Sequence, residues 1–150
     1  MSNEDPSLAE LASRFPAGAL LLNVGVDVIE VDRVKQVYER QKERFLKRVF
    51  TQEEQDYCFS KSNPYPHLAA RFAAKEAVSK AFSTGIGKLF AWKSCSIYHG
   101  PRMQPFVRLD EQGQALMATV GGTDVRITLS HTKTTAVAVA VLVKEASDEG

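Results

Sequence analysis

The sequence of 150 residues lacks the features of several large protein classes. Its two cysteines, Cys58 and Cys95, are too few for a disulfide framework and lack metal-ligand spacing, so we expect two reduced thiols. No apolar run approaches the ~20 residues that a membrane-spanning helix needs, and the N-terminus lacks the basic start and apolar core of a signal peptide. A net charge of +1 argues against a dedicated nucleic-acid binder, which is usually strongly basic. These absences predict a cytoplasmic domain that binds neither membrane nor nucleic acid.

The patterns that are present alternate between strand and helix periods and predict an α+β fold. Leu20–Ile29 is an apolar, β-branched strand in which Asn23, Gly25 and Asp27 share one face. Later strands are expected at Ser94–Tyr98, Pro105–Leu109, Val125–Ser130 and Ala136–Val143. Helices are expected at 33–49 after an Asp32 N-cap, from the Thr51/Glu54 capping box onward, at His67–Phe82 and at Gln114–Val120 after a turn at Asp110–Gly113.

The length of the chain and the positions of its helix-ending prolines and glycines predict one domain over residues 19–145. Residues 1–18 read as a peripheral N-terminal extension, with a short apolar helix face from Leu8 to Phe15 that ends at Pro16 and Gly18. Residues 146–150 read as a frayed C-terminal tail.

An alanine-rich helix followed by a two-glycine turn is the most informative segment. Alanines recur at helical spacing, so one helix face permits a close approach by a neighbouring element; they are Ala70, Ala73, Ala74, Ala77 and Ala81. Glu76 and Lys80 stand four residues apart and are neighbours on a helix, a spacing that by itself indicates a surface ion pair worth ~0.2–0.5 kcal/mol. The glycines of Ser83–Gly87 would let a ligand approach, and free backbone N–H groups in such a turn suit phosphate, although glycine is also the usual helix terminator.

Two further polar residues interrupt predicted strands. Asp27 lies within a valine-rich strand and must face a cleft, a partner charge, a metal or a backbone N–H, because burying it alone would be costly. His131 ends a strand among hydroxyl side chains and Lys133, which suits either an anion site or a polar hairpin turn.

Basic residues crowd the helix after Asp32. They are Arg33, Lys35, Arg40, Lys42, Arg44, Lys47 and Arg48. Such a face is either solvated and balanced by Glu39 and Glu43, or a dock for an acidic protein.

Taken together, these segments resemble the holo-acyl-carrier-protein synthase family of small phosphopantetheinyl transferases. The resemblance covers about Val24 to Val143 and rests on three motifs in order: Gly25–Glu30 with Arg33, Arg71–Ala77 with Lys80 and Thr84–Gly87, and Ser130–Thr132. It implies a single small domain with an antiparallel sheet packed on helices.

The resemblance also implies an activity and a site. It implies transfer of 4′-phosphopantetheine from coenzyme A to a serine of apo-acyl carrier protein in fatty acid biosynthesis, releasing adenosine 3′,5′-bisphosphate. Asp27 and Glu76 would hold Mg²⁺, Glu76 and Lys80 would be catalytic, and either Glu76 or a metal-bound water would accept the serine proton. Coenzyme A would contact Lys80, Ser83, Thr84, Gly85, His131, Thr132 and Lys133. Arg33 would bind the carrier protein. The resemblance also implies a homotrimer with active sites between subunits, as in the small members of the family.

One residue departs from the family pattern, and other functions compete. Ser83 stands where the family usually has glycine, and a left-handed backbone there would cost ~1 kcal/mol or more. A non-catalytic module that binds coenzyme A or a carrier protein is the main alternative; the joint presence of Asp27, Glu76, Lys80 and His131 counts against it. Nucleic-acid binding through the basic helix is disfavoured by the near-neutral charge.

Overall fold

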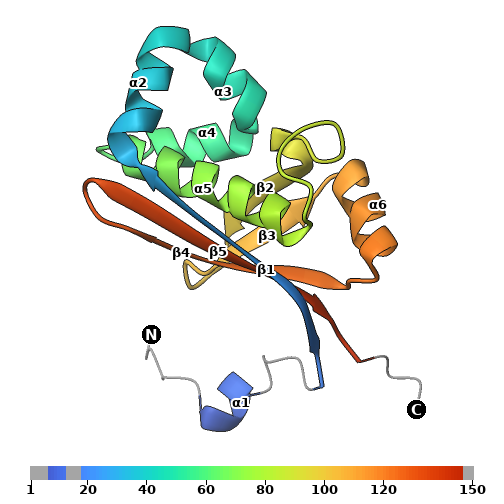
Figure 1. Cartoon of the computed structure of the whole chain (residues 1–150). Coiled ribbons are helices and arrows are strands. Elements are labelled where there is room, and N and C mark those ends of the chain that lie inside the picture. The colour runs from blue at the N-terminus through green and yellow to red at the C-terminus, as the bar shows by residue number, and fades with distance from the viewer. Residues whose placement is uncertain (1–6, 13–17, 147–150) are drawn as a thin grey trace.

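A three-stranded antiparallel sheet is the base on which the main helices lie (Figure 1). The computed structural model describes residues 7–12 and 18–146. The sheet has the order β1-β5-β4 and a separate hairpin pairs β2 with β3. The strands are β1 (Leu20–Glu30), β2 (Cys95–His99), β3 (Pro105–Leu109), β4 (Asp124–His131) and β5 (Thr135–Lys144). The helices are α1 (Leu8–Ala12), α2 (Val31–Gln41), α3 (Glu43–Val49), α4 (Gln52–Phe59), α5 (Tyr65–Ala81), the 3₁₀ turn η1 (Trp92–Ser94) and α6 (Glu111–Val120).

The faces of β1 follow the predicted alternation from Leu22 onward, after an irregularity near the start of the strand. The pairing of β1 with β5 shifts register between Leu21 and Asn23, after which Asn23, Gly25 and Asp27 turn towards the helices. The opposite face of the sheet carries Leu22, Val24, Val26 and Val28, which remain exposed.

Helix α5 lies across β1 and β5 and forms the centre of the core (Figure 1). Its predicted alanine face is buried, since Ala73, Ala74 and Ala77 have no exposed surface. The closest approach is at Gly25, where an added Cβ would lie 1.9 Å from the carbonyl oxygen of Ala77. Glycine is therefore required there because the β1 and α5 backbones touch directly.

The expected strands and the Thr51 capping box are confirmed, but three helix boundaries differ from the sequence predictions. The long basic helix is two helices, because Lys42 adopts a left-handed φ of 49° between α2 and α3. Asp32 is not the N-cap, since α2 already begins at Val31 directly after β1. Asp110 caps α6 by accepting a hydrogen bond from the Gly113 N–H, so the segment expected to be a turn is the first turn of that helix.

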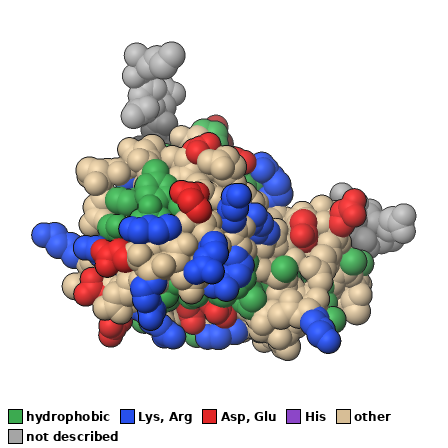
Figure 2. Space-filling view, turned by 90° about the horizontal axis from the view of Figure 1, so that it is seen from above, with side chains coloured by type: hydrophobic (Ala, Val, Ile, Leu, Met, Phe, Trp, Pro, Cys, Tyr) green, Lys and Arg blue, Asp and Glu red, His purple; other side chains and the backbone are tan. Residues whose placement is uncertain are grey.

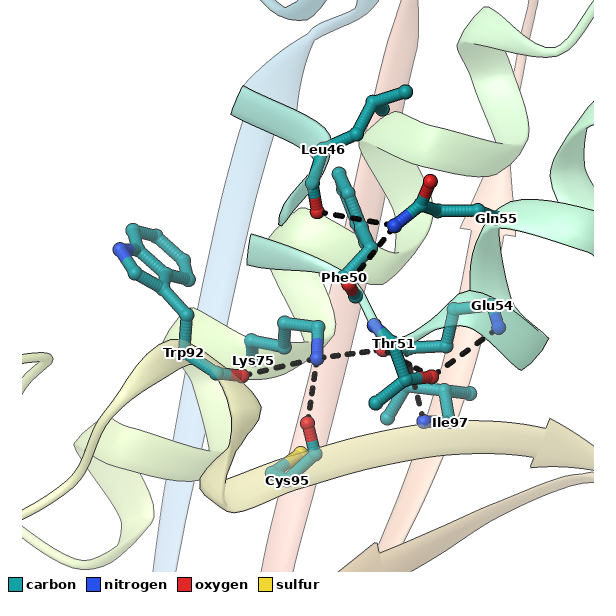
Figure 3. Close-up of polar contacts among 9 residues, drawn as sticks. All are labelled: Leu46, Phe50, Thr51, Glu54, Gln55, Lys75, Trp92, Cys95 and Ile97. Carbon is teal, nitrogen blue, oxygen red and sulfur yellow. Dashed lines mark hydrogen bonds and ion pairs between the residues drawn. The ribbon is translucent and has the colours of Figure 1, made fainter. Parts of the chain in front are cut away.

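A buried ion pair ties α5 to α4 and to the η1–β2 segment (Figure 3). The Lys75 ammonium lies 2.9 Å from a Glu54 carboxylate oxygen, and the two side chains are 0% and 1% exposed. Lys75 also donates to the carbonyl oxygens of Trp92 and Cys95, while Glu54 accepts from the backbone N–H groups of Thr51 and Ile97. Every polar atom of the pair thus has a partner, as a buried charge requires.

Parts of the terminal predictions fall outside the described residues. The N-terminal helix is present as α1, whereas Phe15 and Pro16 lie outside the described part of the chain, as does the tail beyond Ala146. Among the helices that the structure describes, none combines the length and apolar character needed to cross a membrane.

Candidate active site

The predicted catalytic residues meet where β1 crosses the C-terminal half of α5. The Lys80 ammonium lies 3.0 Å from an Asp27 carboxylate oxygen and also donates to the Val26 carbonyl at 3.2 Å. Asp27 is 17% exposed and Lys80 is 50% exposed. The pair therefore lies at the surface, and its carboxylate is mostly covered. Lys80 therefore reaches across to the neighbouring strand, which the i, i+4 spacing with Glu76 did not predict.

Glu76 completes this group as a second, half-buried carboxylate. Burial raises the pKa of Glu76 above its ordinary value of 4.5, and the nearby charge of Asp27 raises this pKa further while Lys80 lowers it. The two carboxylates are thus close enough to repel each other. A cation between them would relieve this repulsion.

Both carboxylates fit a magnesium ion. Mg²⁺ usually binds one or two protein carboxylates and completes its octahedron with waters and substrate phosphates. Asp27 and Glu76 supply those two carboxylates from adjacent elements. Among the described residues, no group of three or more His, Cys, Asp or Glu side chains could hold a metal, so any ion here would need substrate or water oxygens as well.

The turn after α5 is held by its own hydrogen bonds. The Thr84 and Gly85 N–H groups both donate to the Ser79 carbonyl, and the Ser83 N–H donates to the Lys80 carbonyl. The expectation that backbone N–H groups of this turn are free for phosphate is therefore wrong at these three residues. What the turn offers a ligand is the exposed Ser83 hydroxyl and the open surface at Gly85, where an added Cβ would meet no atom within 4 Å.

Ser83 adopts the left-handed backbone that the family glycine would favour. Its φ is 62°, and Gly85 follows with a φ of 64°. The Asn23 side-chain amide donates to the Ser83 hydroxyl oxygen at 3.1 Å and to the Ala81 carbonyl at 2.9 Å. The sequence reasoning missed Asn23, whose only signal was that it shares a strand face with Asp27.

His131 lies at the other end of α5. Its ring is 5.3 Å from that of His67, in the first turn of the helix. His67 and Ala81 are about 21 Å apart at the helical rise of about 1.5 Å per residue. The structure thus groups Asp27, Glu76, Lys80 and the Ser83–Gly85 turn at one end of α5, and it does not bring His131 to them within one chain.

His131 belongs to a cluster that contains all three histidines of the chain. Tyr57 stacks on His99 with ring centroids 4.6 Å apart, and the Arg71 guanidinium lies 4.1 Å from the Tyr57 ring. Burial lowers the pKa of His67 and of His99, and neighbouring positive groups lower both further. The positive charge of the cluster is therefore that of Arg71 and the nearby Lys61, and His67 and His99 favour their neutral forms beside it.

Thr132 and Lys133 lie in the β4–β5 hairpin beside His131. The Thr132 hydroxyl accepts hydrogen bonds from the N–H groups of Thr134 and Thr135, so it closes the hairpin. Lys133 is exposed and lines a hollow of about 370 Å³ with Glu30 and Asp32. In one chain, this hairpin faces acidic side chains as well as open surface.

Arg33 lies on the rim of an apolar cavity of about 210 Å³ between α2, α3 and α5. Val37, Phe45, Phe72 and Trp92 are among the residues that line it. Phe72 precedes Glu76 by one turn of α5, which links the cavity to the carboxylates. Figure 2 shows Lys and Arg side chains gathered on the face where α2 and α3 lie.

Comparison with known proteins agrees with this architecture. The family model of the 4′-phosphopantetheinyl transferase superfamily matches residues 23–140. A holo-[acyl-carrier-protein] synthase from Chlamydia trachomatis is 50% identical over 121 residues, which are 81% of this chain and 98% of the relative. One from Caldanaerobacter subterraneus is 40% identical over 120 residues, covering 80% and 93%.

A solved structure shows the same fold. The crystal structure of Helicobacter pylori holo-[acyl-carrier-protein] synthase in complex with coenzyme A matches with a TM-score of 0.71 and 29% identity, covering 79% of this chain and 98% of that one. The α+β fold, the antiparallel sheet and the family expected from the motifs are thus confirmed. The chain belongs to the 4′-phosphopantetheinyl transferase superfamily, among the holo-[acyl-carrier-protein] synthases.

Proposed function

We propose that Asp27, Glu76 and Lys80 form the centre at which this chain transfers 4′-phosphopantetheine from coenzyme A to a serine of apo-acyl carrier protein. The observation that carries the proposal is the group itself: two carboxylates and an ammonium converge from β1 and α5 at a half-exposed surface. Transfer of a phosphoryl-type group depends mainly on positioning and on neutralising charge, and this group supplies both.

The reaction needs one bond formed and one broken at the diphosphate. The serine oxygen forms a bond to the phosphorus that carries the pantetheine, and the bond from that phosphorus to the bridging oxygen breaks, which releases adenosine 3′,5′-bisphosphate. Lys80 stabilises the negative charge that grows on the leaving phosphate. Either Glu76 or a water on the metal would take the serine proton.

We further propose that Asp27 and Glu76 hold Mg²⁺ while coenzyme A is bound. The repulsion that raises the Glu76 pKa supports this assignment, because a divalent cation would remove it. When bound, the ion would polarise the diphosphate oxygens and offset their charge.

The positive cluster of Arg71 and its neighbours near the start of α5 is our candidate for the site that binds a phosphate group of coenzyme A. Arg71 is 2% exposed, and among the described atoms its Nε is a buried nitrogen without a hydrogen-bond partner. An anionic oxygen would satisfy this donor and offset the charge of the Arg71 guanidinium. Thr132 and Lys133 would extend this contact towards the nucleotide.

The proposed coenzyme-binding residues form two groups, one at Lys80–Gly85 and one at His131–Lys133. They would meet in one site if the protein is a homotrimer with sites between subunits. They lie at opposite ends of α5 in one chain, so a neighbouring subunit could bring its His131 end to the Lys80 end of the next. The outer face of the sheet supports such an assembly. Leu22, Val24, Val26 and Val28 are between 39% and 63% exposed there, and an apolar patch of this kind usually marks an interface.

Arg33 and the basic face of α2 and α3 are proposed to bind the acidic carrier protein. The basic side chains would steer the partner, and the adjoining cavity would take an apolar side chain from it. Because Phe72 lines this cavity one turn from Glu76, a carrier docked here would present its serine near the carboxylates.

Mass spectrometry of apo-carrier protein tests the centre. Wild-type protein with coenzyme A and Mg²⁺ is expected to add the phosphopantetheine mass, and Asp27→Ala and Glu76→Gln are expected to abolish the gain while keeping the circular dichroism spectrum. Glu53→Gln is the matched control, because Glu53 is 67% exposed and pairs only with the surface Arg108 among the ion pairs described here. Full activity of either site variant would refute the assignment.

Metal binding and assembly need their own measurements. Electron paramagnetic resonance of Mn²⁺ with coenzyme A present is expected to show weaker binding in Asp27→Asn than in Glu53→Gln; equal binding would refute the metal site. Sedimentation is expected to show a trimer that Val26→Asp converts to monomers. A wild-type monomer would refute the proposed assembly.

A further inference from the structure

Asn23 has a hydrogen-bond arrangement that determines the direction of the Ser83 hydroxyl. The Asn23 Nδ2 donates to two acceptors, the Ala81 carbonyl at 2.9 Å and the Ser83 oxygen at 3.1 Å. A carbonyl can only accept, so the atom that faces Ala81 must be the amide nitrogen. Its two hydrogens are then both used, one on each acceptor.

The Ser83 oxygen is consequently an acceptor towards Asn23, and its own hydrogen must point elsewhere. A serine hydroxyl has one O–H donor beside its lone pairs. Ser83 is exposed, and the surface next to it at Gly85 is open. The O–H group is therefore available to an acceptor in solution beside the turn.

The backbone around Ser83 cannot supply that donor by itself. The N–H groups of Ser83, Thr84 and Gly85 are all occupied by carbonyls of α5, and the single Thr84 O–H hydrogen is taken up by the nearby carbonyls of Gly85 and Ser79. The Ser83 O–H is thus the polar hydrogen of these three residues that is left for a ligand.

The strand that carries Asn23 also carries Asp27. Asn23 contacts the end of α5 at Ala81, Gly25 touches its backbone, and Asp27 pairs with Lys80. The Asn23 side chain points to this face directly after the register shift of β1. Asn23 thereby fixes the turn relative to the same strand that supplies a carboxylate to the centre.

We propose that Asn23 is a positioning residue that orients the Ser83 hydroxyl to donate to a phosphate oxygen of coenzyme A. The proposal rests on the proposed seat of coenzyme A at the Ser83–Gly85 turn. Serine in this left-handed position then has a use, since the hydroxyl adds a donor to bound phosphate that glycine could not provide. A hydrogen bond to a charged oxygen is among the stronger ones available.

A double-mutant cycle between Asn23 and Ser83 tests the proposal. Ser83→Ala keeps the Cβ and removes the hydroxyl, and it is expected to raise KM for coenzyme A about tenfold, which corresponds to about 1.4 kcal/mol. Asn23→Ala is expected to raise this KM about fivefold in wild type and to have no further effect in Ser83→Ala, because the group that it orients is gone. The kcat and the KM for carrier protein are expected to stay within about twofold.

Calorimetric titration with coenzyme A and thermal unfolding separate positioning from stability. Gln114→Ala is the matched control: the Gln114 side-chain amide also donates to a backbone carbonyl, that of Leu109, away from the site. It is expected to change the melting temperature as Asn23→Ala does, and to leave coenzyme A affinity unchanged. Effects of Asn23→Ala and Ser83→Ala that simply add, or an Asn23→Ala effect on melting temperature alone, would overturn the proposal.

Gly85→Ala distinguishes this inference from the seat on which it rests. It places a methyl group on the open surface of the same turn, at a φ of 64° that alanine adopts only with strain, so its melting temperature is measured beside its affinity for coenzyme A. If Gly85→Ala weakens coenzyme A binding and Ser83→Ala does not, the hydroxyl inference is wrong and the seat stands. If neither variant weakens binding, the seat is wrong and the inference fails with it.

Discussion

Replacing Lys75 with Met is expected to lower the free energy of unfolding by about 3–5 kcal/mol, because it leaves Glu54 charged and buried without its partner. Both side chains are almost completely buried. The substitution also removes the donor to the Trp92 and Cys95 carbonyls, and unpaired buried groups cost roughly 1–3 kcal/mol each. A domain of this size has only about 5–15 kcal/mol in total, so the variant would be marginal.

Urea unfolding followed by circular dichroism measures this loss. With a slope of roughly 1–3 kcal/mol per molar urea, the midpoint is expected to fall by about 2 M. Lys80→Met is the matched control on the same helix, since Lys80 is 50% exposed and its pair with Asp27 is expected to contribute less than about 1 kcal/mol. Lys75→Met with Glu54→Leu is expected to recover only part of the loss, because it removes the buried charge but leaves the Trp92 and Cys95 carbonyls and the Ile97 N–H without their partners. A loss below about 1 kcal/mol in Lys75→Met, or equal losses for the two lysines, would refute the reasoning.

Three other predictions concern packing, pH and thiol reactivity. Gly25→Ala is expected to destabilise the fold by about 3 kcal/mol or more, as its Cβ would overlap the α5 backbone; a melting temperature equal to wild type would contradict this. Because burial and Asp27 raise the Glu76 pKa in the folded state, the metal-free protein is expected to lose stability as pH rises from about 4.5 through that raised pKa. Unfolding titrations of wild type and Glu76→Gln measure this, and a difference that does not grow with pH would contradict it. Burial raises the pKa of Cys58 to about 11 and of Cys95 to about 12, so a disulfide reagent is expected to label both only at the rate of unfolding; rapid labelling of the native protein would contradict the buried positions.

The local sequence was sufficient where short-range chemistry determines structure. The Thr51–Glu54 capping box, the alanine face of α5 and the alternating strands depend on neighbours a few residues away, and each was predicted at its place. The break at Lys42 could not be predicted, because the apolar stripe continues across it and lysine is not a residue that favours the positive φ observed there.

Three residues predicted for the candidate site lie close together in the fold, but the contacts between them were predicted only in part. The motifs identified Asp27, Glu76 and Lys80, but spacing on the helix paired Lys80 with Glu76, whereas the fold pairs it with Asp27 from a distant strand. Asn23 and the Lys75–Glu54 pair were missed for the same reason, since their partners are contributed by other elements. Spacing along one helix shows which side chains are neighbours there and cannot show what the next strand places against them.

The contact at Gly25 has a consequence for how steadily the site holds its shape. Where two elements are separated by side chains, their spacing changes whenever a rotamer changes or a mutation alters a side-chain volume. Here peptide atoms of β1 rest against peptide atoms of α5, so no rotamer lies between the strand that carries Asp27 and the helix that carries Lys80. Thermal motion of side chains on the nanosecond scale therefore leaves this separation unchanged, and only a movement of whole elements can widen it.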